Sequence, residues 1–126
     1  MLKANKSLGQ HWLKDELSLQ TMVEAAGIVS TGTVVEVGPG LGYLTDKLAH
    51  SAQKVIAIEA DPTLLEPLRV QFFQRPNVEI VGADILQYDL TQLPSQYKVV
   101  ANIPYYITSK LLRTFLEAKN SPISMT

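Results

Sequence analysis

Residues 33–42 read TVVEVGPGLG, a run of β-branched residues that leads directly into three glycines. The Val-rich run predicts a buried strand over 33–37, because short apolar runs bounded by turn residues are typical of strands. Gly38, Gly40 and Gly42 follow at a turn into a predicted helix, where glycine lets the backbone bend tightly and approach a ligand. A strand, a glycine-rich turn and a helix in this order open a βαβ unit.

The same alternation of strands and helices continues on both sides of this unit. The sequence predicts further strands over 54–59, 77–81 and 98–102, and helices over 15–26, 42–50, 108–119 and from Asp61 onward. Such alternation predicts an α/β fold with a mostly parallel sheet and helices on both faces. Residues 123–126 resemble the first residues of a fifth strand, so we expect a sheet truncated after about four strands.

Two of the helices carry finer expectations. Asp61 is placed to cap a helix whose first residue is Pro62, where the missing backbone donor costs nothing. Five residues on, the ring of Pro67 would strike the carbonyl of Thr63, so we expect a kink or a restart there. The helix over 108–119 is predicted to turn four apolar residues to one side: Leu111, Leu112, Phe115 and Leu116.

Length and composition bound the functions that this chain can have. Its 126 residues suffice for one domain, and 46% apolar with 18% charged residues is typical of a globular fold. There is no cysteine and only His11 and His50, so we expect neither disulfides nor a metal site. No apolar run reaches the ~18 residues of a membrane span and the start lacks a secretory signal, which predicts a soluble cytoplasmic protein.

Charge is distributed unevenly along the chain. Residues 1–14 carry a net charge of +3, residues 15–97 of −7 and residues 98–126 of +3. If the two basic ends meet in space, they form a rim that could hold a phosphate backbone. Charges scattered in this way are more often ordinary solvated surface.

Three acidic residues at predicted strand ends accompany the glycine turn. The third glycine comes one position earlier than in the G-x-G-x-x-G motif of dinucleotide binders. This spacing argues against NAD and favours a nucleoside that lies close to the loop. The alternative is an ordinary tight connection between a strand and a helix. Glu36 lies inside a strand, where a carboxylate is costly without a partner such as a ligand ammonium or backbone amides. Glu59 follows Gly38 by 21 residues, a spacing suited to ribose hydroxyls, and Asp84 could accept from an adenine amino group.

The predicted fourth strand ends in ANIPYYIT at 101–108, a segment suited to a planar base. Asn102 offers an amide oxygen, Pro104 orients the carbonyl of Ile103, and Tyr105 offers a ring for stacking. Two acceptors can hold both hydrogens of an exocyclic amino group, and stacking contributes about 1–3 kcal/mol per base. The alternative is that Tyr105 and Tyr106 only pack at the entrance of a helix.

Five segments in order resemble one family, the adenine dimethyltransferases of small-subunit rRNA with their relatives that confer erythromycin resistance. The segments are KSLGQHWLKD at 6–15, EVGPGLG at 36–42, IEAD at 58–61, GADIL at 82–86 and NIPYYIT at 102–108. The resemblance implies a Rossmann-like class I methyltransferase that uses S-adenosyl-L-methionine to methylate two adjacent adenines in a hairpin loop of small-subunit rRNA. It also implies that residues 1–126 are the cofactor-binding domain without its later strands and a helical domain.

Roles for individual residues follow from the same resemblance. The residues implied in cofactor binding are Gln10, His11, Leu13, Glu36, Gly38, Gly40, Glu59, Asp84, Ile85 and Asn102. The target base would be held by Ile103, Pro104 and Tyr105, with Asn102 and Tyr105 catalytic as the adenine nitrogen attacks the sulfonium methyl in line. Trp12, where the family usually has Phe, and Pro67 depart from the family pattern.

Two other functions stay open at this point. The site of a DNA-adenine or protein-glutamine methyltransferase uses a similar Asn-Pro-Pro-Tyr segment, although the segment around Gln10 argues against that reading. A chain that binds cofactor or RNA without turnover is the alternative that is not an enzyme.

Overall fold

The computed structural model describes residues 16–103 and 105–126, with the backbone alone at 105 and 106. The elements are, in chain order, α1 (Glu16–Ala26), β1 (Thr33–Val37), α2 (Tyr43–Ser51), β2 (Lys54–Glu59), α3 (Pro62–Phe72), β3 (Val78–Gly82), the 3₁₀ helix η2 (Leu90–Gln92), β4 (Lys98–Ala101), α4 (Tyr105–Leu116) and β5 (Ser124–Met125). The predicted alternation of strands and helices is confirmed.

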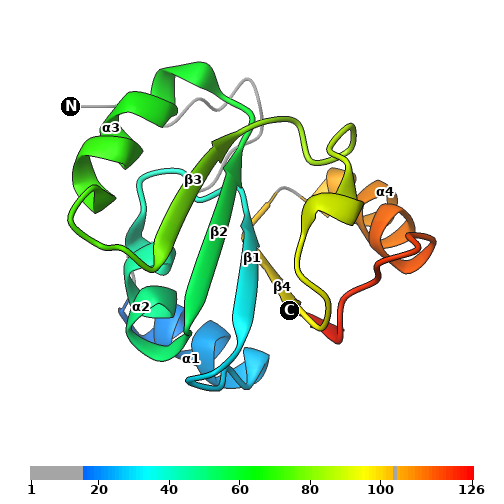
Figure 1. The fold of residues 1–126 in the computed structure, drawn as a ribbon, viewed down its shortest axis with the longest axis horizontal. Coiled ribbons are helices and arrows are strands. Elements are labelled where there is room, and N and C mark those ends of the chain that lie inside the picture. Colours follow the sequence, from blue (N-terminus) through cyan, green and yellow to red (C-terminus); the bar gives the residue numbers. More distant parts are fainter. Residues whose placement is uncertain (1–15, 104) are drawn as a thin grey trace.

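The described strands form one parallel sheet in the order β3-β2-β1-β4-β5 (Figure 1). From β1 the chain moves outward to β2 and β3, and then crosses back to place β4 on the other side of β1. The order therefore reverses between β1 and β4, where the carboxyl ends of neighbouring strands leave a crevice for ligands. Ser124 and Met125 pair with β4 as a short fifth strand, which confirms the prediction for residues 123–126.

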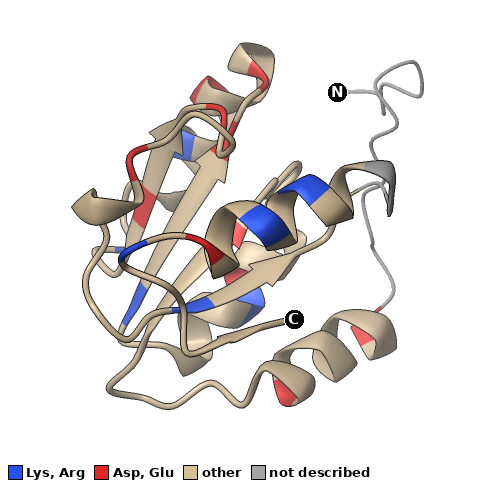
Figure 2. Cartoon of the chain, turned by 90° about the vertical axis from the view of Figure 1, so that its right-hand side faces the viewer, with Lys and Arg blue, Asp and Glu red and all other residues tan. Residues whose placement is uncertain are grey.

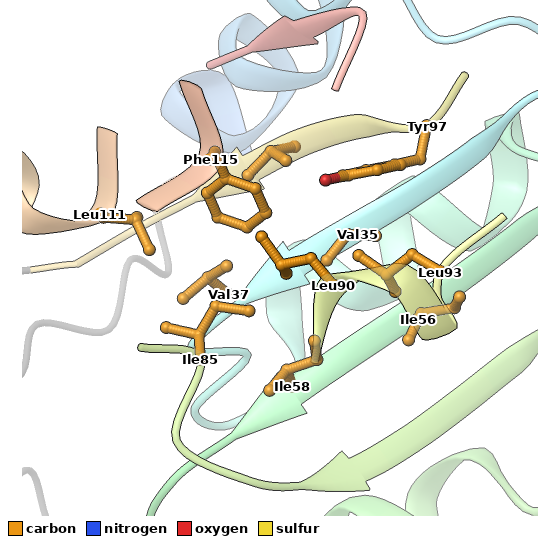
Figure 3. Close-up of a cluster of buried hydrophobic side chains, with 11 residues drawn as sticks. Val35, Val37, Ile56, Ile58, Ile85, Leu90, Leu93, Tyr97, Leu111 and Phe115 are labelled. Carbon is orange, nitrogen blue, oxygen red and sulfur yellow. The ribbon is translucent and has the colours of Figure 1, made fainter. Parts of the chain in front are cut away.

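Helices cover both faces of the sheet, as predicted, because the strands send alternate apolar residues to opposite sides. On one face α1 and α2 pack on Val34, Val55 and Val100, and α3 packs beside them on Val78 and Ile80. The other face is covered by α4 and the segment that contains η2; its buried cluster is shown in Figure 3. This cluster is formed by Val35, Val37, Ile56, Ile58, Ile85, Leu90, Leu93, Tyr97, Val99, Leu111 and Phe115.

One local expectation, on α3, fails in part. Asp61 caps the helix by accepting from Thr63 N at 3.0 Å and Pro62 is its first residue, as predicted. The helix does not restart at Pro67, however, but continues to Phe72. Pro67 lies on the exposed side of α3, where the carbonyl of Thr63 can tilt toward water while the opposite side stays packed.

The second difference is in α4, which begins and ends three residues earlier than predicted. Only Leu111 and Phe115 of the predicted apolar side are buried, whereas Leu112 and Leu116 are 40% and 70% exposed. Residues one position apart on a helix differ by about 100° in direction, so the pair at 112 and 116 points away from the sheet.

Residues 16–103 and 105–126 contain neither a membrane-spanning helix nor a cluster of metal-binding side chains. No helix there is long and apolar enough to span a membrane. No group of three or more His, Cys, Asp or Glu side chains in that part of the chain is arranged to hold a metal ion.

Candidate active site

The glycine loop after β1 adopts a backbone conformation that side chains disfavour. Gly38, Gly40 and Gly42 have φ of 74°, 58° and 88°, in the left-handed region that glycine enters without steric cost. The loop is fixed to the end of β2, because Gly38 N donates to the carbonyl of Ile58 at 3.0 Å. The early third glycine thus serves the turn itself: it is the N-cap residue of α2.

The loops that follow β1 and β4 lie against each other. A Cβ atom at Gly38 would stand 3.4 Å from Cγ2 of Ile103. Val37 pairs with Ala101 at the ends of the two strands, so the chain leaves both strands at the same level of the sheet. This is the crevice that the strand order creates.

Glu59 ends β2 and is only 4% exposed. Its Oε1 accepts from Gly40 N and its Oε2 accepts from Asp61 N, both at 3.0 Å. The carboxylate is therefore held rigidly by two backbone donors, and each oxygen keeps a further lone pair for another donor. The binding of ribose hydroxyls by Glu59 stays a prediction. The backbone N–H of Gly40 donates to Glu59 and is therefore not free to donate to a ligand.

Glu36 is buried in the middle of the fold, with 1% of its surface exposed. The hydroxyl of Thr45, in the first turn of α2, donates to its Oε1. Burial raises the pKa of Glu36 to about 8; the hydrogen bond from Thr45 lowers it, and the charge of Glu59 raises it further. Burial of this acid inside a strand therefore favours its neutral form, and Glu36 stays mostly protonated at neutral pH.

A small pocket lies between the ends of β1 and β4, with about 250 Å³ of empty space when open solvent is included. The described residues that line it are Leu19, Glu36, Gly38, Pro39, Leu41, Tyr43, Leu44 and Asn102. Asn102 is half-buried, and it opens onto the same space as the glycine loop. Three of the candidate residues, Glu36, Gly38 and Asn102, are therefore gathered in one site.

Asp84 and Ile85 follow β3 at the same edge of the sheet, outside this pocket. Gly82 pairs with Glu59, which brings the residues after β3 beside the end of β2. The exposed Asp84 accepts from Leu86 N at 3.0 Å through Oδ1. The side chain of Ile85 is buried in the cluster of Figure 3, so only its backbone can face a ligand.

The remaining predicted site residues lie outside the described part of the chain. These are Gln10, His11, Leu13 and Pro104, together with the side chain of Tyr105. Their roles stay predictions, as does a basic rim that includes residues 1–14. Among the described basic residues, Lys98 donates to the carbonyls of Ala26 and Gly27, while Lys110 and Arg113 give α4 its exposed basic positions (Figure 2).

Sequence reasoning missed the partner of Glu36. An acid inside a buried strand signals that a partner exists, and a ligand ammonium or backbone amides were expected. The structure supplies a side-chain hydroxyl, that of Thr45, nine residues away across the glycine loop. Pro39, Leu41 and Tyr43 also line the pocket and carried no separate signal beyond their place in or after the loop.

A parallel sheet that reverses its order beside a glycine loop, with acids at its carboxyl edge, defines a Rossmann-like α/β fold. Solved structures agree: the 23S rRNA methyltransferase ErmE is 35% identical with a TM-score of 0.82, covering 91% of this chain and 47% of its own. A dimethyladenosine transferase from Plasmodium falciparum is 29% identical with a TM-score of 0.77, covering 90% of this chain and 42% of its own.

The chain belongs to the ribosomal RNA adenine dimethylase family, whose model matches residues 1–126. Ribosomal RNA small subunit methyltransferase A of Dehalococcoides mccartyi strain BAV1 is 48% identical over 127 residues, which cover 98% of this chain and 44% of that protein. The protein of the same name from Alkaliphilus oremlandii is 39% identical over 130 residues, which cover 98% and 45%. The chain thus spans less than half the length of these relatives.

Proposed function

We propose that this chain acts in the transfer of methyl groups from S-adenosyl-L-methionine to the exocyclic amino groups of two adjacent adenines in small-subunit rRNA. One observation carries the proposal: the pocket joins the glycine loop, which would bind the cofactor, to Asn102, which would hold the amino group. Membership of the ribosomal RNA adenine dimethylase family and the names of the relatives support the choice of substrate.

The described residues fit a nucleoside cofactor. Side chains are absent at Gly38 and Gly40, so a ligand can approach the backbone of the loop closely. Glu59 has lone pairs left for ribose hydroxyls after binding Gly40 and Asp61. At the neighbouring strand end, Oδ2 of Asp84 and the backbone N–H of Ile85 would meet an adenine edge, whereas Oδ1 of Asp84 accepts from Leu86 N and the carbonyl of Ile85 accepts from Tyr88 N. When bound, the cofactor supplies an electrophilic methyl group on a sulfonium sulfur.

The chain's own residues would prepare the adenine nitrogen for attack. The lone pair of an exocyclic amino group is delocalised into the ring, which makes the nitrogen a weak nucleophile. Acceptors at the Asn102 side chain and the Ile103 carbonyl would hold its two hydrogens and favour the pyramidal nitrogen of the transition state. Stacking on Tyr105 would fix the plane of the base, and positioning would supply the rest of the rate.

A hairpin loop is the substrate that this mechanism favours. The target base must leave its stack to enter the site, which costs a few kcal/mol and least where it is unpaired. The partner would be small-subunit rRNA or a precursor of the small subunit, and the place of action the cytoplasm, where such subunits are assembled.

A methyl-transfer assay tests the proposal. The chain is incubated with radiolabelled S-adenosylmethionine and small subunits that lack the two methylations, and the labelled nucleoside is identified. Label in N6-methylated adenosine is the expected result, with fully methylated subunits as the matched control. Label in adenine of a DNA duplex or in a glutamine peptide would favour the rival methyltransferases, and cofactor binding without any transfer would favour the reading without turnover.

A further inference from the structure

A second pocket lies beside β3, the outermost strand on its side of the sheet (Figure 1). It is lined by Arg69 and Phe73 at the end of α3, by Arg75 in the turn that follows, and by Val78 and Ile80 on β3. It has about 540 Å³ of empty space when open solvent is included. No described residue lines both this pocket and the candidate active site. The pocket lies toward the amino-terminal end of β3, whereas the candidate active site lies at the carboxyl ends of the strands.

Phe73 presents its ring to solvent at this pocket. It is 76% exposed, the largest exposed fraction among the large apolar residues that the structure describes. Its neighbour Phe72 is buried and holds the end of α3 on the sheet, so the packing of the helix does not require a second ring. A single exposed apolar side chain is common and by itself indicates no function. An exposed aromatic ring does offer a face on which a planar group can stack.

Two arginines accompany the ring, and none of the described residues that line the pocket is acidic. Arg69 is exposed, and no acidic side chain in the described part of the chain lies within ion-pair distance of it. Arg75 donates to Oδ1 of Asp46 at 3.0 Å and to the carbonyl of Asp46 at 3.3 Å, which leaves other guanidinium donors for a ligand. Glu79 of β3 pairs with Lys54 at 3.2 Å and, by the alternation of a strand, points to the other face of the sheet. The pocket therefore suits an anionic group.

The position of Arg69 in the last turn of α3 has an alternative explanation, because a cation there is favourable by itself. That role requires neither an exposed ring nor a second arginine from outside the helix. Phe73 keeps helical backbone angles, with φ of −65° and ψ of −23°. Residues four apart on a helix lie on the same side, so Arg69 and Phe73 present a cation and a ring together.

We propose that this pocket binds one nucleotide of single-stranded RNA, with the base stacked on Phe73 and a neighbouring phosphate held by Arg69 and Arg75. Proteins typically bind single-stranded nucleic acid with aromatic rings that stack on bases and with cations that hold the backbone. The choice of RNA rests on the proposed function, in which small-subunit rRNA is the partner. The pocket would contact that RNA away from the target adenine, and so add to its affinity without touching the reacting atoms.

Fluorescence anisotropy of hexauridine, end-labelled with fluorescein and titrated with the 126-residue chain, measures this contact. Hexauridine contains no adenine, so it does not offer the target base of the proposed reaction. Phe73→Ala should weaken binding about 5- to 100-fold, as expected for the loss of one stacked base, and leave its salt dependence unchanged. Phe73→Tyr keeps a ring and should bind as the wild-type chain does. Arg69→Gln should weaken binding and reduce the slope of log Kd against log salt concentration by about 0.7, the value for one phosphate contact.

Two exposed residues that do not line the pocket provide matched controls. Val70→Ala shortens another exposed apolar side chain of α3, and Lys54→Gln removes a positive charge at the same end of the neighbouring strand. Both variants should bind hexauridine as the wild-type chain does.

Three results would overturn the inference: no binding of hexauridine by the wild-type chain, equal binding by Phe73→Ala, or equally tight binding of hexaglutamate, which would mean that negative charge alone is recognised. Equally tight binding of uridine monophosphate would assign the pocket to free nucleotides and overturn the choice of RNA. The methyl-transfer assay decides the proposed function separately. Transfer by a chain whose hexauridine binding does not depend on Phe73 spares the proposed function. Binding that depends on Phe73, in a chain that transfers no methyl group, supports the RNA contact and not the proposed reaction.

Discussion

The backbone N–H of Gly40 donates to Oε1 of Glu59 over 3.0 Å, and this bond ties the glycine loop after β1 to the end of β2. The other oxygen of Glu59 accepts from Asp61 N at the start of α3. One buried carboxylate therefore fixes the loop and the entry to a helix at once. If Glu59 also binds ribose, the group that recognises the cofactor is the one that holds its binding loop in shape.

Replacing Glu59 should therefore affect stability as well as binding. Glu59→Ala leaves the N–H groups of Gly40 and Asp61 without their acceptor, at about 1–3 kcal/mol each. We expect a loss of about 2–4 kcal/mol in the free energy of unfolding, measured with urea, and at least tenfold weaker binding of S-adenosylmethionine. Glu66→Ala on the exposed side of α3 is the control. Unchanged stability of Glu59→Ala would show that the two bonds do not hold the loop.

Glu36 should make the stability of the chain depend on pH. Burial raises its pKa from 4.5 to about 8, so between these values the folded chain binds more protons than the unfolded chain. The free energy of unfolding should then fall as pH rises from about 4.5 to about 8, and level off above. In Glu36→Gln this contribution should disappear. The free energies of unfolding of the wild-type chain and of Glu36→Gln are measured with urea at each pH. A difference between them that stays constant from pH 4.5 to pH 8 would contradict the account.

The conformation of Gly42 can be tested against a second glycine of the same kind. Both Gly42 and Gly27 have positive φ, but a Cβ atom at Gly42 would lie 2.7 Å from Oε1 of Gln71 and 3.0 Å from the buried ring of Phe72. At Gly27 the nearest atom, Nζ of Lys98, is 3.5 Å away. Gly27→Ala should cost about 1–2 kcal/mol for the backbone alone. Gly42→Ala should lower the melting temperature clearly more than Gly27→Ala does. Equal decreases would mean that the ring of Phe72 moves aside at little cost.

Asn102 should act on transfer rather than on binding. Asn102→Ala removes an acceptor for the target amino group and leaves Glu59 and the glycine loop intact. We expect the rate of methyl transfer to fall about 100-fold or more, as when one stabilising polar group is removed from an active site. The affinity for S-adenosylmethionine should change less than threefold. A parallel loss of affinity would assign Asn102 to cofactor binding and contradict its separate role in transfer.

The sequence predicted the elements of the fold well because its local patterns agree with the packing. Strands β1, β2 and β4 are Val- and Ile-rich runs that lie buried in the sheet, and their predicted ends differ from the observed ends by at most one residue. Pro67 shows the limit of such reasoning. A local rule predicts a kink or a restart there, but the helix does not restart, because Leu64 and Leu68 stay packed along one side of α3.

The site was harder to predict, because its contacts join residues that no sequence period relates. The spacing of Gly38 and Glu59 indicated the correct edge of the sheet. The hydrogen bond between Thr45 and Glu36, by contrast, forms because the glycine loop reverses the chain and places the first turn of α2 beside β1. The exposure of Leu112 also depends on the angle at which α4 meets the sheet, and its periodicity alone did not fix that angle.

The most direct test of the central claim is to locate bound S-adenosylmethionine on the chain. In ¹⁵N–¹H NMR spectra of the labelled chain, titration with S-adenosylmethionine should shift the amide signals of Gly38, Asp84 and Asn102 most strongly. Signals of Thr33 and Lys54, which pair at the opposite, amino-terminal edge of the sheet, should stay in place. Absence of shifts at the first three residues, or shifts concentrated at Thr33 and Lys54, would contradict the account.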